Sequence, residues 1–63
     1  MGRRDWLIKI RKDNHKTQVG IAEKVNISHQ YYSRIEKGLR SPSTGLAKKI
    51  AEVLNFEWTR FYE

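Results

Sequence analysis

Apolar residues recur at intervals of three and four along most of this chain, which is the spacing of one helix face. The stripes fall in residues 5–13, 17–25, 28–37 and 46–54, and the aromatic-rich residues 56–62 fit a last short turn of helix. No segment keeps the strict alternation of apolar and polar positions that marks a half-buried strand. The pattern therefore predicts a compact all-α domain of five short helices.

Residues with capping and turn preferences stand between these stripes. Hydroxyl side chains suited to a helix N-cap precede three of them: Thr17, Ser28 and either Ser41 or Ser43. Asn26, Gly38 and Asn55 stand where helices should end, and Gly and Asn tolerate the left-handed backbone that ends many helices. The helix boundaries are thus predicted by the residues on either side of each stripe.

Length and composition narrow the class of protein. The chain has 63 residues, 38% of them hydrophobic and seven aromatic, which is too apolar for a disordered tail. A domain of this size buries only about 60% of its unfolded surface, so it has little room for a deep active site. It contains no Cys, which excludes disulfides and thiolate zinc sites. We expect one domain, residues 1–63, that folds on hydrophobic contacts alone.

Other function classes lack their sequence signals. No Ser-His-Asp arrangement, phosphate loop or HExxH motif is present, so we expect neither an enzyme nor a cofactor. The two histidines are fourteen residues apart and make a poor metal ligand set. The longest apolar run, Trp6 to Ile8, is far shorter than a membrane span or a signal sequence core. These absences favour a cytoplasmic, non-membrane protein.

The net charge is +6 and is unevenly distributed. Residues 1–16 carry six basic and two acidic side chains, residues 17–42 four and two, and residues 43–63 three of each. Such an excess points to nucleic acid, an anionic membrane or an acidic protein as partner, without choosing among them. Arg3 and Arg4 are expected to add an unstructured electrostatic contribution.

Residues 17–37 match a helix-turn-helix. This motif needs a small residue where two helices cross, a turn residue able to adopt positive φ, and apolar anchors on the second helix. Ala22 and Asn26 supply the first two, and Tyr32 with Ile35 supplies the anchors. The motif projects the start of its second helix outward, at a size that fits a major groove about 12 Å wide.

The whole chain resembles the lambda-Cro/C1-type (XRE-like) helix-turn-helix family of phage and bacterial transcriptional regulators from about Leu7 to the C-terminus. The matching residues are Leu7-x-x-Ile10-Arg11, Thr17-Gln18-x-x-Ile21-Ala22, Ser28 through Ile35-Glu36-Lys37-Gly38, Pro42-Ser43 and Ile50-Ala51-x-x-Leu54. The aromatic final segment also fits. Three residues depart from the family pattern: Gly20 replaces an acid, Lys16 an apolar residue and Leu39 a basic one.

The resemblance implies a five-helix DNA-binding domain whose recognition helix spans residues 28–37. By family position, His29, Gln30 and Arg34 face base edges, Gln18 contacts a phosphate, and Tyr31 and Ser33 lie near the DNA backbone or the edge of the groove. Further candidate backbone contacts are Ser28 and, at the end of the recognition helix, Lys37 and Arg40. The chemistry agrees, because Arg pairs with guanine and Gln with adenine through two hydrogen bonds each. The resemblance also implies a structural ion pair between Arg11 and Glu36.

Two functions follow from this sequence. The first is a repressor-like, sequence-specific regulator that binds double-stranded DNA as a dimer on an inverted repeat. Its homodimer surface would be the C-terminal aromatic segment, which contains Phe56, Trp58, Phe61 and Tyr62. The alternative is an interaction adaptor or an antitoxin built on the same scaffold. The sequence leaves open whether the chain is a minimal regulator or a fragment of a longer one.

Overall fold

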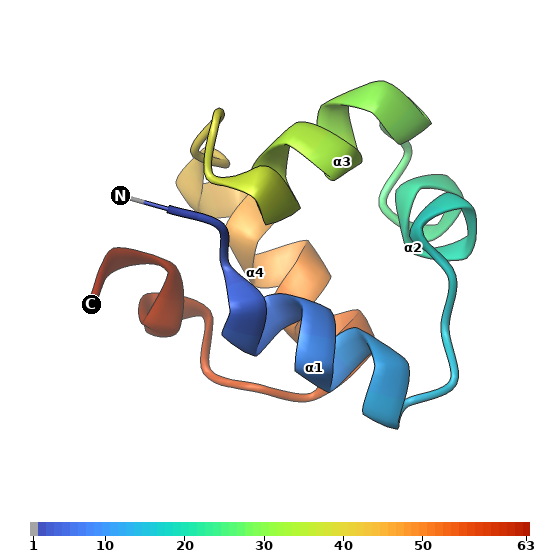
Figure 1. Cartoon of the computed structure of the whole chain (residues 1–63), viewed down its shortest axis with the longest axis horizontal. Coiled ribbons are helices and arrows are strands. Elements are labelled where there is room, and N and C mark those ends of the chain that lie inside the picture. The colour runs from blue at the N-terminus through green and yellow to red at the C-terminus, as the bar shows by residue number, and fades with distance from the viewer. Residues whose placement is uncertain (1) are drawn as a thin grey trace.

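The computed structural model describes residues 2–63, which form four α-helices and a final 3-10 turn (Figure 1). The elements are α1 (Asp5–Asp13), α2 (Gln18–Lys24), α3 (His29–Lys37), α4 (Thr44–Leu54) and η1 (Trp58–Tyr62). These residues include no strand, so the predicted all-α class is confirmed. The fifth helix was predicted without its type, and it is a tighter 3-10 turn of five residues. No helix among residues 2–63 is long and apolar enough to span a membrane.

Three helices begin at the hydroxyl residues that the sequence suggested. Thr17 accepts a hydrogen bond from the Gly20 N–H at 2.9 Å, and Ser28 accepts one from the Tyr31 N–H at 3.1 Å. The fourth helix starts at Ser43, whose Oγ accepts from the Leu46 N–H at 3.2 Å. Each cap satisfies one of the N–H groups that the first turn of a helix leaves without a partner.

The residues that follow α2, α3 and α4 include one each in the left-handed backbone conformation. Gly38, Asn26 and Asn55 have φ values of 79°, 63° and 62°, as the sequence predicted. His15 also has a positive φ, 58°, in the turn between α1 and α2. A histidine is a less common choice for this conformation than Asn or Gly, so the sequence carried no clear signal for it.

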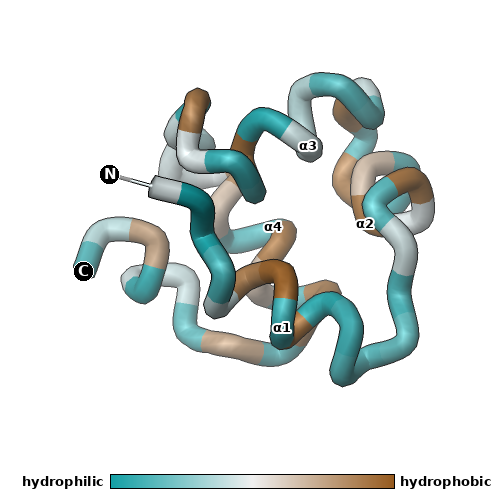
Figure 2. Tube along the Cα trace, viewed as in Figure 1, coloured by the Kyte–Doolittle hydropathy of each residue, from teal (hydrophilic) through white to brown (hydrophobic). Residues whose placement is uncertain are grey.

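The core lies between the four α-helices. Its members are buried apolar side chains from every helix: Leu7, Ile21, Ala22, Val25, Tyr32, Ile35, Ala47, Ile50, Leu54 and Phe61. Figure 2 shows the corresponding pattern along the chain, with short hydrophobic stretches interrupted by hydrophilic ones in each helix. The helical spacing of the apolar residues therefore decides which face of each helix turns inward.

An aromatic cluster attaches the C-terminal segment to α1. The rings of Trp6, Phe56 and Phe61 lie 5.3–5.6 Å apart, two of the three pairs edge to face. Trp58 and Tyr62 form a second edge-to-face pair at 6.0 Å. The segment after α4 is thus held by ring contacts, and it lies on the same side of the molecule as the N-terminus (Figure 1).

Arg4 differs from the sequence expectation. Its N–H donates to the Glu36 carbonyl at 2.7 Å, and its guanidinium donates to the carbonyl of Ile35 at 2.6 Å. The expectation that Arg4 is unstructured is therefore wrong. A single arginine in a basic N-terminal segment gave no sign of contacts more than thirty residues away. Arg3 is exposed, and it pairs with Asp5 across 2.7 Å.

Candidate nucleic-acid interface

Helices α2 and α3 are joined by a short turn and pack against each other, with α2 seen nearly end-on beside one end of α3 (Figure 1). The turn is closed by the Ile27 N–H, which donates to the Ala22 carbonyl at 3.0 Å, and by the left-handed backbone of Asn26. Ala22 is only 2% exposed, so a small side chain occupies the place where the two helices meet. This is the helix-turn-helix arrangement that residues 17–37 predicted.

Helix α3 has two unlike faces. Tyr32, Ile35 and Glu36 are buried against the rest of the domain. The opposite face forms an open hollow lined by polar and charged side chains: His29, Gln30, Ser33, Arg34 and Lys37. Because these positions recur with the period of the helix, the structure brings the three predicted base-contact residues onto one exposed surface.

The predicted backbone-contact residues lie on this face or beside it. Ser28 is the exposed N-cap of α3, and Lys37 is its last residue. Tyr31 is half-buried, and the guanidinium of Arg40 lies over its ring at 5.4 Å from the centroid. Arg40 belongs to the segment that follows α3. A cation–π contact of this kind keeps the Arg40 charge close to the recognition helix.

Positive charge on the α3 face is not neutralised within the protein. Among residues 2–63 the ion pairs are Arg3–Asp5, Lys9–Asp13 and Arg11–Glu36, and none of them involves Arg34, Lys37 or Arg40. Pairing of Arg34 with Glu23, the simplest non-functional explanation for Arg34, does not occur in the structure. The α3 face and the segment that follows it therefore present three cations to solvent.

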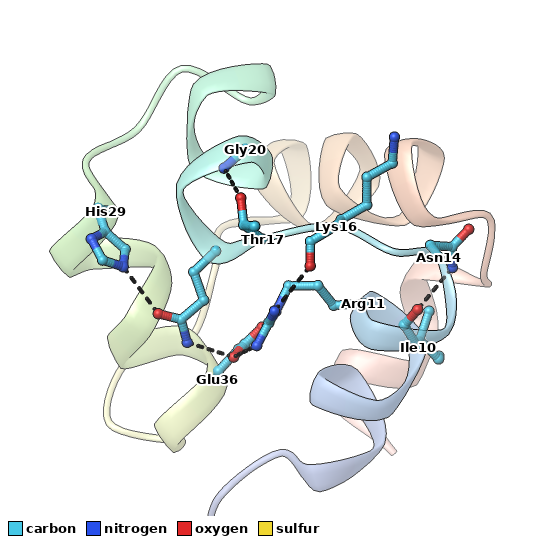
Figure 3. A network of polar contacts seen from close by, with 9 residues as sticks. Ile10, Arg11, Asn14, Lys16, Thr17, Gly20, His29 and Glu36 are labelled. Carbon is cyan, nitrogen blue, oxygen red and sulfur yellow. Dashed lines mark hydrogen bonds and ion pairs between the residues drawn. The ribbon is translucent and has the colours of Figure 1, made fainter.

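Behind this surface lies an ion pair between Arg11 and Glu36 (Figure 3). Arg11 Nε donates to Glu36 Oε2 at 2.6 Å and Nη2 donates to Oε1 at 3.2 Å, while Nη1 donates to the Lys16 carbonyl at 3.0 Å. The side chains are 11% and 1% exposed. This two-bond geometry connects α1 to the buried side of α3.

The carboxylate of Glu36 has a third donor. Gln18 Nε2 donates to Glu36 Oε1 at 2.7 Å. Burial by itself would raise the pKa of Glu36, but the hydrogen bonds donated by Arg11 and Gln18, the nearby Tyr32 hydroxyl and the positive charge of Arg11 together outweigh it and hold the pKa below its ordinary value. Glu36 is therefore ionised at neutral pH and fixes parts of α1, α2 and α3 around one charge.

Gln18 also orients His29. A carboxylate only accepts hydrogen bonds, so Gln18 must turn its amide nitrogen to Glu36 and its oxygen to His29. His29 Nε2 lies 3.0 Å from that oxygen, and it must therefore carry the proton of the bond. In the neutral ring, Nδ1 is then left as a hydrogen-bond acceptor. The ion pair thus sets the orientation of a side chain on the exposed face.

Sequence reasoning missed this part of the site. Gln18 was expected near the DNA backbone, with no expectation that its amide connects Glu36 to His29. The available signal was the presence of amide, acid and imidazole groups on helices predicted to pack together. Sequence spacing alone does not show which polar groups meet across a helix pair.

No cluster of three or more His, Cys, Asp or Glu side chains with metal-binding geometry occurs in residues 2–63.

Comparisons with known proteins agree with this architecture. Residues 7–61 match the model of a helix-turn-helix family. The chain is 45% identical over 60 residues to YqaF of Bacillus subtilis (strain 168), named as an uncharacterised HTH-type transcriptional regulator; the match covers 95% of this chain and 79% of the relative. No solved structure matches the chain. The chain therefore belongs to the XRE-type, or lambda-Cro/C1-type, helix-turn-helix family and is a DNA-binding transcriptional regulator.

Proposed function

We propose that this regulator is repressor-like, and that it recognises a specific double-stranded DNA sequence by placing α3 in the major groove. The observation that carries the proposal is the exposed face of α3, where polar side chains gather on a helix whose other face is fixed by the core and by Glu36. A rigid helix with polar groups at defined positions is suited to reading base edges. Residues 1–63 would then act as one domain, by binding and not by catalysis.

Each of the three base-contact candidates has a preferred base. Arg34 has the two-pronged donor geometry that fits guanine O6 and N7, and Gln30 has the donor and acceptor that fit adenine N6 and N7. His29 offers Nδ1 as an acceptor, because Nε2 is engaged by Gln18. An acceptor selects the amino groups of adenine or cytosine in the major groove.

Contacts to phosphate would fix the register of α3 on the duplex. We assign them to six residues on or beside the exposed face: Gln18, Ser28, Tyr31, Ser33, Lys37 and Arg40. Lys37 and Arg40 supply charge, and the others supply hydroxyl or amide groups. Binding by such contacts releases counterions, so the affinity for DNA should fall steeply as salt is raised.

The test is selection of binding sites from random duplex DNA at two salt concentrations, with Arg34→Ala and Lys49→Ala compared with the unaltered chain. Lys49 is an exposed cation on α4, so Lys49→Ala removes the same charge away from the α3 face. We expect an enriched motif that contains guanine, lost with Arg34→Ala and kept with Lys49→Ala. Salt-dependent binding without any enriched motif would contradict sequence-specific recognition and favour an adaptor or an antitoxin.

We further propose that the chain binds as a homodimer through its C-terminal aromatic segment. Of the four aromatic residues, Phe61 is buried and Phe56 packs edge to face against Trp6, so Trp58 and Tyr62 are the members that remain for contact. The Tyr62 side chain is 51% exposed. Two copies related by a two-fold axis would read half-sites about 34–36 Å apart, one turn of DNA.

Dimer formation is tested with Tyr62→Glu, which places a charge in the proposed contact. We expect two chains per inverted repeat in sedimentation of the complex, and loss of cooperative binding in the variant while affinity for an isolated half-site persists. A single chain on the selected site would contradict the dimer.

A regulator of this family acts on cellular DNA, and we place it in the cytoplasm of a bacterial or phage-infected cell.

A further inference from the structure

The N-terminal residues 2–4 lie across the end of the recognition helix. The Arg4 N–H donates to the Glu36 carbonyl at 2.7 Å, and the carbonyl oxygen of Gly2 lies so close to the Cα of Gly38 that a Cβ there would overlap it. Main-chain atoms of the first residues are thus in direct contact with the point where α3 ends. We call residues 2–4 the N-terminal strap.

The side chain of Arg4 connects three parts of the fold. One nitrogen, Nη1, donates to the Ile35 carbonyl at 2.6 Å and to the Arg40 carbonyl at 3.1 Å. The guanidinium also lies over the Phe61 ring, 5.5 Å from its centroid. Arg4 therefore joins the last turn of α3, the segment after it and η1 through a single planar group.

The contacts of Arg4 are stabilising because of where the contacted carbonyls lie. The last four carbonyls of an α-helix have no partner within the helix, and they form the negative end of its dipole. The Arg4 guanidinium adds a charged donor to the Ile35 carbonyl, which also accepts from the Gly38 N–H at 3.2 Å, and it complements the negative end of the helix. The Arg4 guanidinium is thus held in place by contacts within the protein.

The segment held in this way, residues 38–42, carries a proposed DNA contact. The Leu39 and Arg40 N–H groups donate back to the Arg34 carbonyl at 2.9 and 3.3 Å, and the Arg40 guanidinium rests on Tyr31. Both the backbone and the side chain of Arg40 are therefore fixed before DNA arrives. Such preorganisation raises affinity, because less conformational entropy is lost on binding.

We propose that Arg4 is a positioning residue for DNA binding, which holds residues 38–42 against the end of α3 so that Arg40 is placed for a phosphate. This inference rests on the proposed role of Arg40 in DNA binding. The nearest matched residue is Arg3, which has the same charge and lies next to Arg4 but pairs only with the exposed Asp5.

The first arm of the test uses the protein without DNA. Amide hydrogen exchange is followed at Leu39 and Arg40 in the unaltered chain, Arg4→Ala, Arg4→Lys and Arg3→Ala, at a temperature where all are folded. We expect exchange at these two amides to be at least tenfold faster in both Arg4 variants and unchanged in Arg3→Ala. The Ile27 amide, in the α2–α3 turn, should be unaffected in all of them. Equal exchange at Leu39 and Arg40 in all four proteins would overturn the proposal.

The second arm measures affinity for the duplex enriched in the selection above, in a double-mutant cycle of Arg4→Ala with Arg40→Ala. If Arg4 acts through Arg40, Arg4→Ala weakens binding about tenfold in the chain that retains Arg40 and less than twofold in the chain that lacks it. Arg4→Lys should bind nearly as weakly as Arg4→Ala, since a lysine keeps the charge without the planar fork.

Three outcomes of this arm are informative. Additive losses, or full affinity in Arg4→Lys, would mean that Arg4 acts by its own charge, and would overturn the positioning role. If Arg40→Ala alone leaves affinity unchanged, the proposed phosphate contact of Arg40 is wrong, and with it the role of the strap in DNA binding. In that case the exchange data still show whether Arg4 holds residues 38–42 in the free protein.

Discussion

At the scale of single residues, Tyr32 is an unusual member of the core. Its side chain is fully buried, and its hydroxyl makes no hydrogen bond of standard geometry among residues 2–63, although Glu36 and Arg11 lie close enough to interact with it. Burial raises the pKa of Tyr32 well above its ordinary value, and the nearby charge of Glu36 acts in the same direction. The phenol is therefore neutral under all working conditions, and a buried polar group without a partner costs free energy.

We expect Tyr32→Phe to keep or to raise the stability of the domain, by up to about 1 kcal/mol, because it removes a buried hydroxyl that makes no hydrogen bond of standard geometry. Thermal unfolding monitored by circular dichroism measures the change. Tyr62→Phe is the matched control, since the Tyr62 hydroxyl donates to the Pro42 carbonyl at 2.9 Å and its loss should lower stability. A clear destabilisation by Tyr32→Phe would show that the Tyr32 hydroxyl has a partner in solution.

At the scale of elements, the recognition helix is defined by how its two ends are built. Ser28 caps its start through the Tyr31 N–H, and Gly38 ends it with φ of 79°. The start needs only a local hydroxyl. The end combines a left-handed residue with the close approach of the strap, so it depends on a segment distant in sequence.

We expect Gly38→Ala to destabilise the domain by about 2 kcal/mol or more, because left-handed backbone alone costs an L-residue roughly 1–2 kcal/mol. The overlap of the new Cβ with the Gly2 carbonyl adds to this cost. Gly45→Ala is the control, since a Cβ at Gly45 meets nothing within 4 Å and alanine favours the helix. Chemical denaturation of both variants should give shifts of opposite sign. Equal shifts would contradict the strap geometry.

Local signals predicted most of the elements. The bounds of α1, Asp5–Asp13, follow from one apolar stripe, and the turn at Asn26 follows from a residue type that accepts positive φ. The 3-10 form of η1 was not predictable, since its aromatic residues are anchored by rings of distant segments. Helix type there depends on packing that the local sequence does not encode.

The candidate site was also predictable only where local sequence signals decide the structure. Helical periodicity places His29, Gln30 and Arg34 on one face, and the structure has them there; their contacts with DNA remain a prediction. The bonds of Gln18 to its two neighbours, and those of Arg4 to two carbonyls, join groups far apart in the chain. Polar contacts of this range depend on the exact packing of helices, which single-residue preferences do not specify.

At the scale of the whole molecule, one buried charge connects the DNA face to the rest of the fold. Glu36 receives hydrogen bonds from Arg11 on α1 and from Gln18 on α2, and its own helix carries the exposed polar face. Breaking such a pair by removing one partner typically costs about 3–5 kcal/mol. A domain of this size has only about 3–9 kcal/mol of stability in total, so Glu36→Ala should leave it largely unfolded on mild heating.

The pH dependence of stability follows from the same group. Because the folded-state pKa of Glu36 lies below its ordinary value near 4.5, its ionisation stabilises the fold above that value. This contribution is lost as the pH falls through the folded-state pKa, so acid should destabilise the domain below about pH 4.5.

Glu36→Gln lacks the titrating group, and we expect it to be less stable than the unaltered chain at pH 7 and closer to it at pH 3. Glu52→Gln, at an exposed position of α4, should follow the unaltered chain throughout. Thermal unfolding at the two pH values measures the difference. If Glu36→Gln loses as much stability between pH 7 and pH 3 as the unaltered chain does, then protonation of Glu36 is not the cause of the loss of stability in acid.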